Sequence, residues 1–390
     1  MGTHSKTKGI LHAYVILLFL SACVYALMYA PQPMFGTLSR EFGIDRTTTG
    51  LSVTVFMLSL AISPLCAGLI LKRLGNVRIL AISICAVVAT GFCMPFVETY
   101  AQFLALRFIE GLAVPMILTS LMTTIAELFR HLDLGRALAG YVASNLLGTV
   151  CGRILCGLMA EHLGWRWTLS AVCFSFVLAL FTLHLLPKSH QHGPVHHLKD
   201  YLLLFRQKGV MPLLLVEACG IFVFAAIGNL IPFRIAELGF GNSESLAGFM
   251  YLGYSTGLVA TFVVQPLIRL LGGSRRFLLF SSAFFLLSFF SMACPSLWVL
   301  FGGLWFVAAG EFLVHALCPS LINRLGSRSG ECERSMINGF FLSVYYMSGV
   351  LGTMIPSTLY SLFGWTVCYA LLQGVLFISF VTIFIKCHDV

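Results

Sequence analysis

The feature that most constrains this chain is a succession of long apolar runs separated by short polar breaks. A helix of about 20 residues crosses the ~30 Å hydrocarbon core of a lipid bilayer, and each run is close to that length. Only 10% of the residues are charged, whereas soluble domains carry roughly 25%. Because no water-soluble surface can be built from this composition, the sequence predicts an all-α membrane protein.

The apolar runs predict twelve transmembrane helices. Their expected bounds are residues 10–34, 48–71, 79–97, 101–129, 138–160, 166–187, 211–233, 245–268, 277–295, 297–320, 337–360 and 366–385. The first run follows Lys6 and Lys8, as a secretory signal would, but it is too long for one and lacks a cleavage site of small residues. It is therefore predicted to remain as a span, and the even number of spans places both termini on one side.

Positive charges predict the orientation of these helices. The predicted inner segments hold 18 of the 24 Lys and Arg residues, the outer loops hold four, and Arg107 and Arg153 lie within spans. Since cytoplasmic loops retain positive charge, both termini are expected inside. The net charge of +9 then reflects orientation, so binding of nucleic acid is not expected. The expected location is a cell membrane, with the bacterial inner membrane as first choice.

The longest inner break runs from Pro187 to Val210 and divides six spans from six. The sequence therefore predicts an N-terminal bundle at residues 1–187, a cytoplasmic linker at 188–210 and a C-terminal bundle at 211–390. The linker carries four histidines that could bind a metal, namely His190, His192, His196 and His197. A solvated linker is the favoured interpretation, because no cysteine or ordered ligand spacing accompanies them.

The two predicted bundles share features at a nearly constant offset of 197 to 200 residues. The matching positions are Pro33 and Pro232, Gly75 and Gly272, Gly111 and Gly310, Gly152 and Gly352, and the turns Gly164-Trp165 and Gly364-Trp365. Each match alone is weak, but their order predicts an internal repeat. Two related six-helix units around a central cavity are the architecture of many transporters.

The loop after the second predicted span contains Gly68, Lys72, Arg73, Gly75 and Arg78. These residues resemble the inner-loop signature of the major facilitator superfamily: Gly68, Arg73 and Gly75 fit it, Lys72 stands where the family has Asp, and Arg78 falls one position late. The resemblance covers essentially the whole chain. It implies a twelve-helix fold of two pseudo-symmetric bundles, with these residues at an inner gate.

The fourth predicted span carries Arg107, Glu110 and Gly111, which resemble an R-x-x-x-G motif of that family. The fifth carries Gly148, Gly152 and Gly157 around Arg153, followed by Trp165-Arg166, and is similar to the drug-proton antiporter branch. In the family, the arginine of the fourth span is often associated with proton coupling. Small residues at the spacing of these glycines also allow neighbouring helices to approach closely, which predicts a helix-packing motif.

Six ionisable residues fall inside the predicted spans: Arg107, Glu110, Arg153, Glu217, Glu311 and His315. Such groups cost about 2.5–3.5 kcal/mol each on insertion scales, so they are expected to face a wet cavity or a partner. They are the predicted residues for substrate binding or proton coupling. For Glu217, reaching toward the inner surface is an alternative to a functional role.

Arg107 and Glu110 lie one turn apart on one helix face, and Arg153 is expected at a similar depth on the next span. If those two spans are adjacent, the three residues form a cluster with one net positive charge. One interpretation is a site that alternates between a proton on Glu110 and an anionic substrate group on Arg153. The other is a buried salt-bridge network that only fastens helices.

Glu311 is predicted near the middle of its span with His315 one turn away, so either could carry a proton. Six tyrosines could line a cavity for a flat organic solute or could merely pack: Tyr25, Tyr29, Tyr251, Tyr254, Tyr345 and Tyr346. The thirteen cysteines mostly lie within apolar runs and form no C-x-x-C pair. We therefore predict no disulfide framework, no metal site within the spans and no cofactor.

These features predict a secondary active transporter rather than an enzyme. The leading hypothesis is a monomer that exports small organic compounds in exchange for protons. The alternative is uptake or exchange of an organic anion, such as a carboxylate, a siderophore or a peptide-like metabolite, which the two arginines support. A membrane enzyme or a sensor is disfavoured because no nucleophile-base pair is evident, and direct use of ATP is disfavoured because no Walker-type sequence is present.

Overall fold

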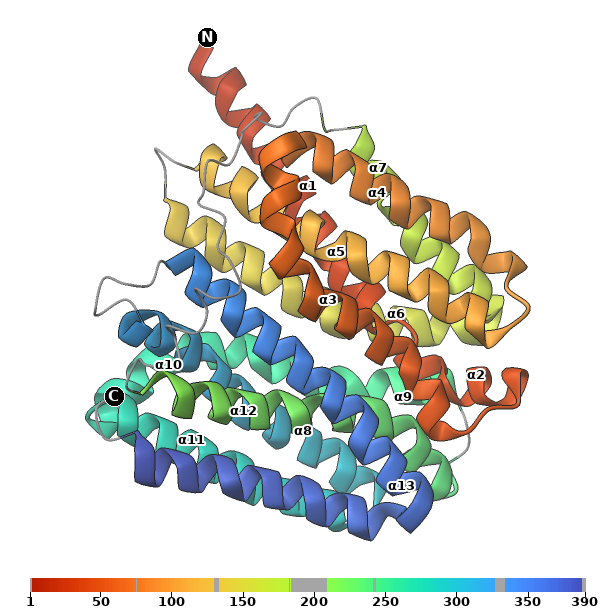
Figure 1. Ribbon diagram of the computed structural model, residues 1–390, viewed down its shortest axis with the longest axis vertical. Helices are drawn as coiled ribbons and strands as arrows, with labels where there is room; N and C mark the ends of the chain where they lie inside the picture. The colour runs from red at the N-terminus through yellow and green to blue at the C-terminus, as the bar shows by residue number, and fades with distance from the viewer. Residues whose placement is uncertain are drawn as a thin grey trace.

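The computed structural model describes residues 2–74, 76–129, 133–181, 183, 209–240, 243–326 and 334–387. Within these ranges the chain is almost entirely helical, and its long helices run side by side (Figure 1). The first group of helices is α1 Gly2–Tyr29, α2 Phe35–Phe42, α3 Arg46–Leu74, α4 Asn76–Cys93, α5 Tyr100–Leu128, α6 Leu134–Ser175 and α7 Val177–Leu180. The second is α8 Val210–Glu237, α9 Glu244–Met250, α10 Thr256–Leu271, α11 Ser274–Ser288, α12 Leu297–Gly326 and α13 Arg334–Lys386. Short 3₁₀ helices join them at η1 Gln32–Met34, η2 Met94–Phe96, η5 Tyr251–Ser255 and η6 Phe289–Ala293.

The outer surface of the bundle is apolar. Large hydrophobic side chains project outward from several helices, and Phe96, Phe262 and Trp298 are each about 80% exposed. Among the described residues, 8 helical segments are long and apolar enough to cross a membrane. Lipid is the environment in which such a surface is stable, so the expectation of an all-helical membrane protein is confirmed.

Two of these segments are too long for one crossing, and each is broken at a glycine. The segments are Arg136–Leu180, with 45 residues, and Ile337–Lys386, with 50. Gly164 in the first has φ 77° and ψ 160°, and Gly364 in the second has φ 76° and ψ −176°. Only glycine adopts this region readily, because it has no Cβ. The predicted turns therefore break both helices in the same way.

The tryptophans after these glycines fix the turns. The Trp165 indole N–H donates to Glu41 Oε2 at 2.5 Å, and the Trp365 indole N–H donates to the carbonyl oxygen of Met292 at 3.0 Å. Both rings are buried. A buried indole with a satisfied N–H stabilises a turn by burying apolar area without leaving a polar group unpaired.

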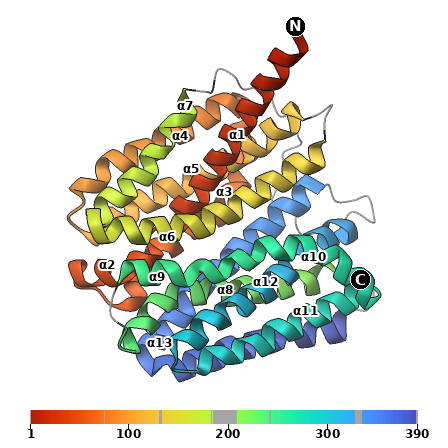
Figure 2. The ribbon, with the colours of Figure 1, turned by 180° about the vertical axis from the view of Figure 1, so that it is seen from behind.

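The helices form two groups that are evident from both sides of the molecule. In Figures 1 and 2, α1–α7, coloured red to yellow-green, lie together, and α8–α13, coloured green to blue, lie together beside them. We call them the N-terminal group and the C-terminal group. Most of the predicted linker, through residue 208, lies outside the described residues.

The glycines of the predicted packing motif lie where helices touch. A Cβ on Gly148 would lie 2.2 Å from the carbonyl oxygen of Ala22, and one on Gly152 would lie 2.6 Å from Cα of Ala26, so both glycines let α6 pack against α1. A Cβ on Gly157 would lie 2.4 Å from the carbonyl oxygen of Glu244 on α9. Each distance is too short for any larger residue without a backbone shift.

The two groups are joined by hydrogen bonds at one end of the bundle, which we call the sealed end. There Gln32 Nε2 donates to Asn229 Oδ1 at 3.0 Å, and the hydroxyls of Thr54 and Thr353 share a bond of 2.7 Å. Further bonds between the groups at this end join Thr37 to Glu244, Thr47 to Ser357 and Ser361, and Glu161 to Ser243 and Ser245. Helices α2 and α9 lie at this end, and both chain termini lie at the opposite end (Figures 1 and 2).

The predicted inner-gate motif is only partly described. Gly68, Lys72 and Arg73 lie on α3 in a stretch whose side chains fall outside the described ones, and Gly75 falls outside the described residues altogether. Arg78, in the first turn of α4, is exposed. The gate function of this motif therefore stays a prediction.

Candidate functional site

Arg107 and Glu110 form an ion pair that is fully buried in the N-terminal group. Arg107 Nη1 donates to Glu110 Oε2 at 2.5 Å, Nη2 donates to the carbonyl oxygen of Met28 at 3.0 Å, and Nε donates to that of Ser52 at 3.4 Å. The guanidinium also lies 4.4 Å from the centre of the Phe56 ring. All donor groups of Arg107 are thus directed at α1, α3 and α5.

The second oxygen of Glu110 is also occupied. Its Oε1 accepts a hydrogen bond from the Thr90 hydroxyl at 2.9 Å and another from the Cys173 thiol at 3.4 Å. Together the pair connects α5 to α1, α3, α4 and α6 with no exposed polar atom. This geometry supports the interpretation of Arg107 and Glu110 as a network that fastens helices.

Arg153 does not complete the expected cluster, and that part of the prediction is corrected. Its Nε donates to Gln32 Oε1 at 2.7 Å and its Nη1 donates to the carbonyl oxygen of Thr149 at 2.7 Å, and no described carboxylate forms an ion pair with it. The prediction assumed that spans joined by a short loop pack closely. Helix α6 instead packs mainly against α1, α9, α4 and η5, and only slightly against α5.

Aromatic rings surround the Arg153 guanidinium. The ring centres of Tyr29, Tyr251 and Tyr254 lie 3.9, 4.8 and 5.1 Å from it. The attraction of a cation to ring faces partly compensates the burial of this charge. Since Gln32 in turn binds Asn229, Arg153 is part of the contact between the two groups at the sealed end.

A cavity of about 280 Å³ lies between the two groups next to this arginine. The N-terminal group contributes side chains of α1 and α6, and the C-terminal group contributes those of α8, α10, α12 and α13. The lining is rich in rings and carries a few polar groups: Tyr25, Tyr29, Phe224, Phe312, Phe341, Tyr345, Tyr346, Asn145, Thr149 and His315. Four of the six tyrosines singled out in the sequence therefore line a cavity, and Tyr251 and Tyr254 contact Arg153 instead.

A second cavity of about 350 Å³ adjoins the first and shares Tyr25, Asn145, Leu342 and Tyr346 with it. Side chains of α3 and α5, including Leu60, complete its wall. Among the described side chains that line these two cavities, His315 is the one whose ordinary pKa lies near neutrality. Small-molecule sites are commonly concave, mostly apolar and furnished with a few placed polar groups, as this one is.

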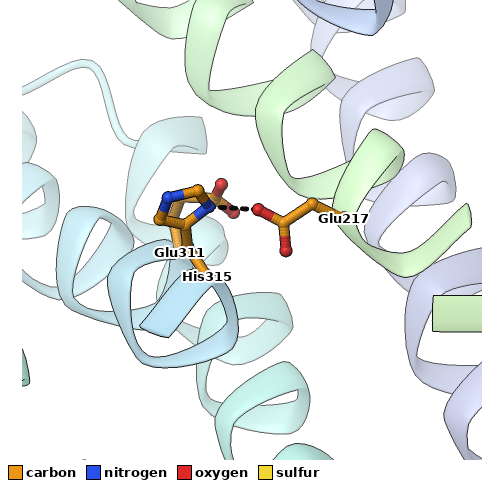
Figure 3. Close-up of side chains that lie close together, drawn as sticks. All are labelled: Glu217, Glu311 and His315. Carbon is orange, nitrogen blue, oxygen red and sulfur yellow. Dashed lines mark hydrogen bonds and ion pairs between the residues drawn. The ribbon is translucent and has the colours of Figure 1, made fainter. Parts of the chain in front are cut away.

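Glu217, Glu311 and His315 come together at the wall of the first cavity. Glu217 lies on α8, whereas Glu311 and His315 lie one turn apart on α12 (Figure 3). His315 Nδ1 is in direct hydrogen-bond contact with Glu217 Oε1. Glu217 is 2% exposed and Glu311 is 3% exposed, so Glu217 does not extend to the surface. We call these three residues the acidic triad.

A glycine that the sequence analysis did not single out makes room for the triad. A Cβ on Gly220 of α8 would lie 2.2 Å from Glu311 Oε2, so a larger residue here would displace this carboxylate from its place against α8. The available signal was the position of Gly220, three residues after Glu217 and therefore on the same helix face.

Two groups of apolar helices that enclose a cavity and meet over it at one end define a membrane transport protein. The chain belongs to the Major Facilitator Superfamily, whose family model matches residues 17–325. Members of this family are transport proteins rather than enzymes. The expected superfamily is thereby confirmed.

Known proteins agree with this assignment. The chain is 26% identical to the inner membrane transport protein YnfM of Escherichia coli over 60% of its own length and 57% of that protein, so the match spans just over half of this relative. It is 23% identical to an uncharacterized transporter of Buchnera aphidicola, covering 89% of this chain and 87% of that one. A crystal structure of the nucleoside transporter NupG, in a mutant form, superimposes with a TM-score of 0.78 at 12% identity, over 95% of this chain and 99% of NupG. At that identity the similarity concerns the fold alone.

Proposed function

We infer that this protein is a secondary active transporter that exports small organic compounds in exchange for protons by alternating access. The cavity between the two helix groups carries this proposal, because it is lined by both groups and lies next to the contacts that close the sealed end. Movement of one group against the other would expose such a cavity to alternate sides. The resemblance to drug-proton antiporters supports the proton coupling and the direction.

The same proposal includes twelve spans with both termini inside the cell and two bundles that move as units. Support comes from the breaks at Gly164 and Gly364, since each divides one long helix into two lengths that could cross a bilayer. Both termini also lie at the end opposite the sealed end. With the termini inside, the sealed end faces outward and the described conformation is closed to the exterior.

The walls of the cavity favour a flat, largely apolar substrate. Tyrosine and phenylalanine rings provide faces for stacking, while Asn145, Thr149 and His315 can bind polar edges of a ligand. Nucleosides share the planar ring but are more polar than these walls. Uridine and adenosine therefore probe the polar limit of the substrates that this cavity could accept.

The proposal can be tested with purified protein in liposomes that contain a pH-sensitive dye. Addition of uridine, adenosine or a panel of flat organic compounds under an imposed pH gradient should produce proton movement with at least one of them. Ala316→Trp, which fills the cavity, should abolish the signal, and Ala316→Ser should retain it. Equal proton movement in the parent and in Ala316→Trp would exclude transport through this cavity.

A second candidate is uptake or exchange of an organic anion. Arg153 favours it, because no described carboxylate pairs with this buried charge and its neighbour Tyr29 lines the cavity. Arg107 offers no support, because Glu110 already binds it.

Arg153 variants separate the two candidates. A lost charge-assisted contact costs roughly 1.5–3 kcal/mol, which is about a tenfold to hundredfold loss of affinity. If the substrate is anionic, Arg153→Ala should bind a carboxylate probe that much more weakly, and Arg153→Lys should recover part of the loss because it keeps the charge. Unchanged affinity in both variants would eliminate the anion candidate.

A further inference from the structure

We propose that the acidic triad of Glu217, Glu311 and His315 binds a divalent transition-metal cation. One imidazole nitrogen and one oxygen from each carboxylate lie within 4.8 Å of one another (Figure 3). Metal-to-ligand distances of about 2.0–2.2 Å place neighbouring ligand atoms roughly 3–3.5 Å apart. The three side chains therefore need only small adjustments to surround one ion.

Two buried oxygen atoms of the triad have no partner within the described protein. They are Glu217 Oε2 and Glu311 Oε2. A buried carboxylate oxygen without a hydrogen bond is costly, so native proteins normally supply a donor or a cation. Gly220 leaves room for Glu311 beside α8, so the unpaired Glu311 Oε2 lies against the helix that carries Glu217. Bound metal gives both oxygens a partner.

The charges of the triad also suit a dication. Among the described residues, no Lys or Arg forms an ion pair with Glu217 or Glu311, and His315 is the basic partner of Glu217. Two carboxylates and one protonated imidazole leave a net negative charge in a buried place, which is unfavourable. Two carboxylates, one neutral imidazole and one dication are neutral.

The mixture of ligands indicates which metal binds. Imidazole nitrogen suits zinc, cobalt, iron and similar ions, whereas magnesium and calcium prefer oxygen ligands alone. His315 lines the cavity, and its side chain is 35% exposed, so an ion can enter from there. Three protein ligands leave at least one coordination position for water on the cavity side.

The experiment uses full-length protein in detergent, without an affinity tag, and with the four linker histidines replaced by alanine. Cobalt(II) is the probe, because its visible absorption reports coordination directly. We expect this parent to bind one equivalent of cobalt and to bind magnesium at least tenfold more weakly. A triad that binds only protons would bind no cobalt. Absence of cobalt binding therefore overturns the proposal.

Matched variants locate the site. Glu217→Gln, Glu311→Gln and His315→Ala should each weaken cobalt binding at least tenfold. Glu98→Gln and His162→Ala change the same residue types at exposed positions outside the triad and should bind cobalt like the parent. Parental affinity in all three triad variants would place the metal elsewhere and refute the assignment.

A measurement on the parent covers the case in which a triad variant does not fold. Diethyl pyrocarbonate modifies accessible histidines, and peptide mass spectrometry resolves His315 from His162. Zinc should slow modification of His315 at least tenfold and leave His162 unaffected. Equal rates at His315 with and without zinc would contradict binding at the triad, whatever the variants show.

Discussion

Neutralising Glu110 should destabilise the protein strongly, and neutralising Arg107 together with it should restore much of the loss. In Glu110→Gln the side chain keeps its shape, but the buried Arg107 charge loses its counter-ion. Removing one partner of a buried pair costs about 3–5 kcal/mol, because the remaining charge is uncompensated. Replacing both partners with apolar residues of similar volume is often close to neutral.

The contacts of the pair refine this magnitude. Glutamine has one acceptor oxygen, whereas Glu110 accepts from Arg107 on one oxygen and from Thr90 and Cys173 on the other. At least one of these three donors therefore loses its acceptor as well, at about 1–3 kcal/mol. In Arg107→Met/Glu110→Leu, the Ser52 carbonyl oxygen lies inside α3 and keeps its helical bond, whereas the Met28 carbonyl oxygen, in the last turn of α1, loses its donor. We expect the double variant to be more stable than Glu110→Gln by at least about 2 kcal/mol.

The free energy of unfolding can be measured by circular dichroism during titration with a denaturing detergent in mixed micelles. The double-mutant cycle comprises the parent, Arg107→Met, Glu110→Leu and the double variant, and Glu110→Gln is measured beside them under the same conditions. If the losses of the single variants simply add in the double variant, the pair is not a structural unit. If Glu110→Gln is as stable as the parent but loses proton-driven transport, Glu110 acts in proton coupling instead.

Three further predictions concern the backbone. Gly148→Ala should cost about 1–3 kcal/mol, because its Cβ would meet the Ala22 carbonyl oxygen. Gly374→Ala is the control and should be neutral or stabilising, since a Cβ there would meet nothing within 4 Å. Thermal unfolding of the two variants measures the difference. Gly364→Ala should cost about 1–3 kcal/mol through its positive φ alone, and parental stability would refute this. Asp45 accepts from Thr48 N–H at 3.0 Å as an N-cap, and hydrogen bonds from Thr48 lower the pKa of Asp45. Asp45→Ala should therefore cost about 0.5–2 kcal/mol at neutral pH. Because the folded-state pKa of Asp45 is lowered, the stability difference between the parent and Asp45→Ala should be complete above the usual carboxyl range and should shrink as pH falls through the lowered pKa. A stability difference that grows in acid would contradict this prediction.

Features determined by neighbours along the chain were predictable from the sequence. Apolar runs identified the helices, and the glycine spacing in α6 identified a face that packs closely, because both depend on residues within a few turns. The turns at Gly164 and Gly364 were recognisable because each sits between apolar lengths and repeats at an offset of 200. Arg107 and Glu110 are three residues apart, so their pairing follows from helix geometry.

Features determined by the choice of neighbouring helix were not predictable. The sequence placed Arg153 beside Glu110 because a short loop joins their helices, but the side chain lies against Gln32 and the tyrosines of another helix group. The acidic triad joins α8 to α12 across 98 positions, and no local pattern links them. Tertiary packing alone brings such groups together, and a single sequence does not encode it in its periodicity.

The chemistry of the sealed end determines how easily the contacts between the two groups can open there. Every hydrogen bond between the two groups there involves a hydroxyl or an amide, and within the described residues no ion pair crosses between them. Most of these bonds join two neutral groups, and such bonds contribute only about 0.5–1.5 kcal/mol each, since water offers comparable partners once they break. A closure of this kind can be hydrated stepwise, without separating opposite charges in the membrane. In the proposed alternating-access cycle, the sealed end is therefore suited to opening and closing repeatedly under thermal motion.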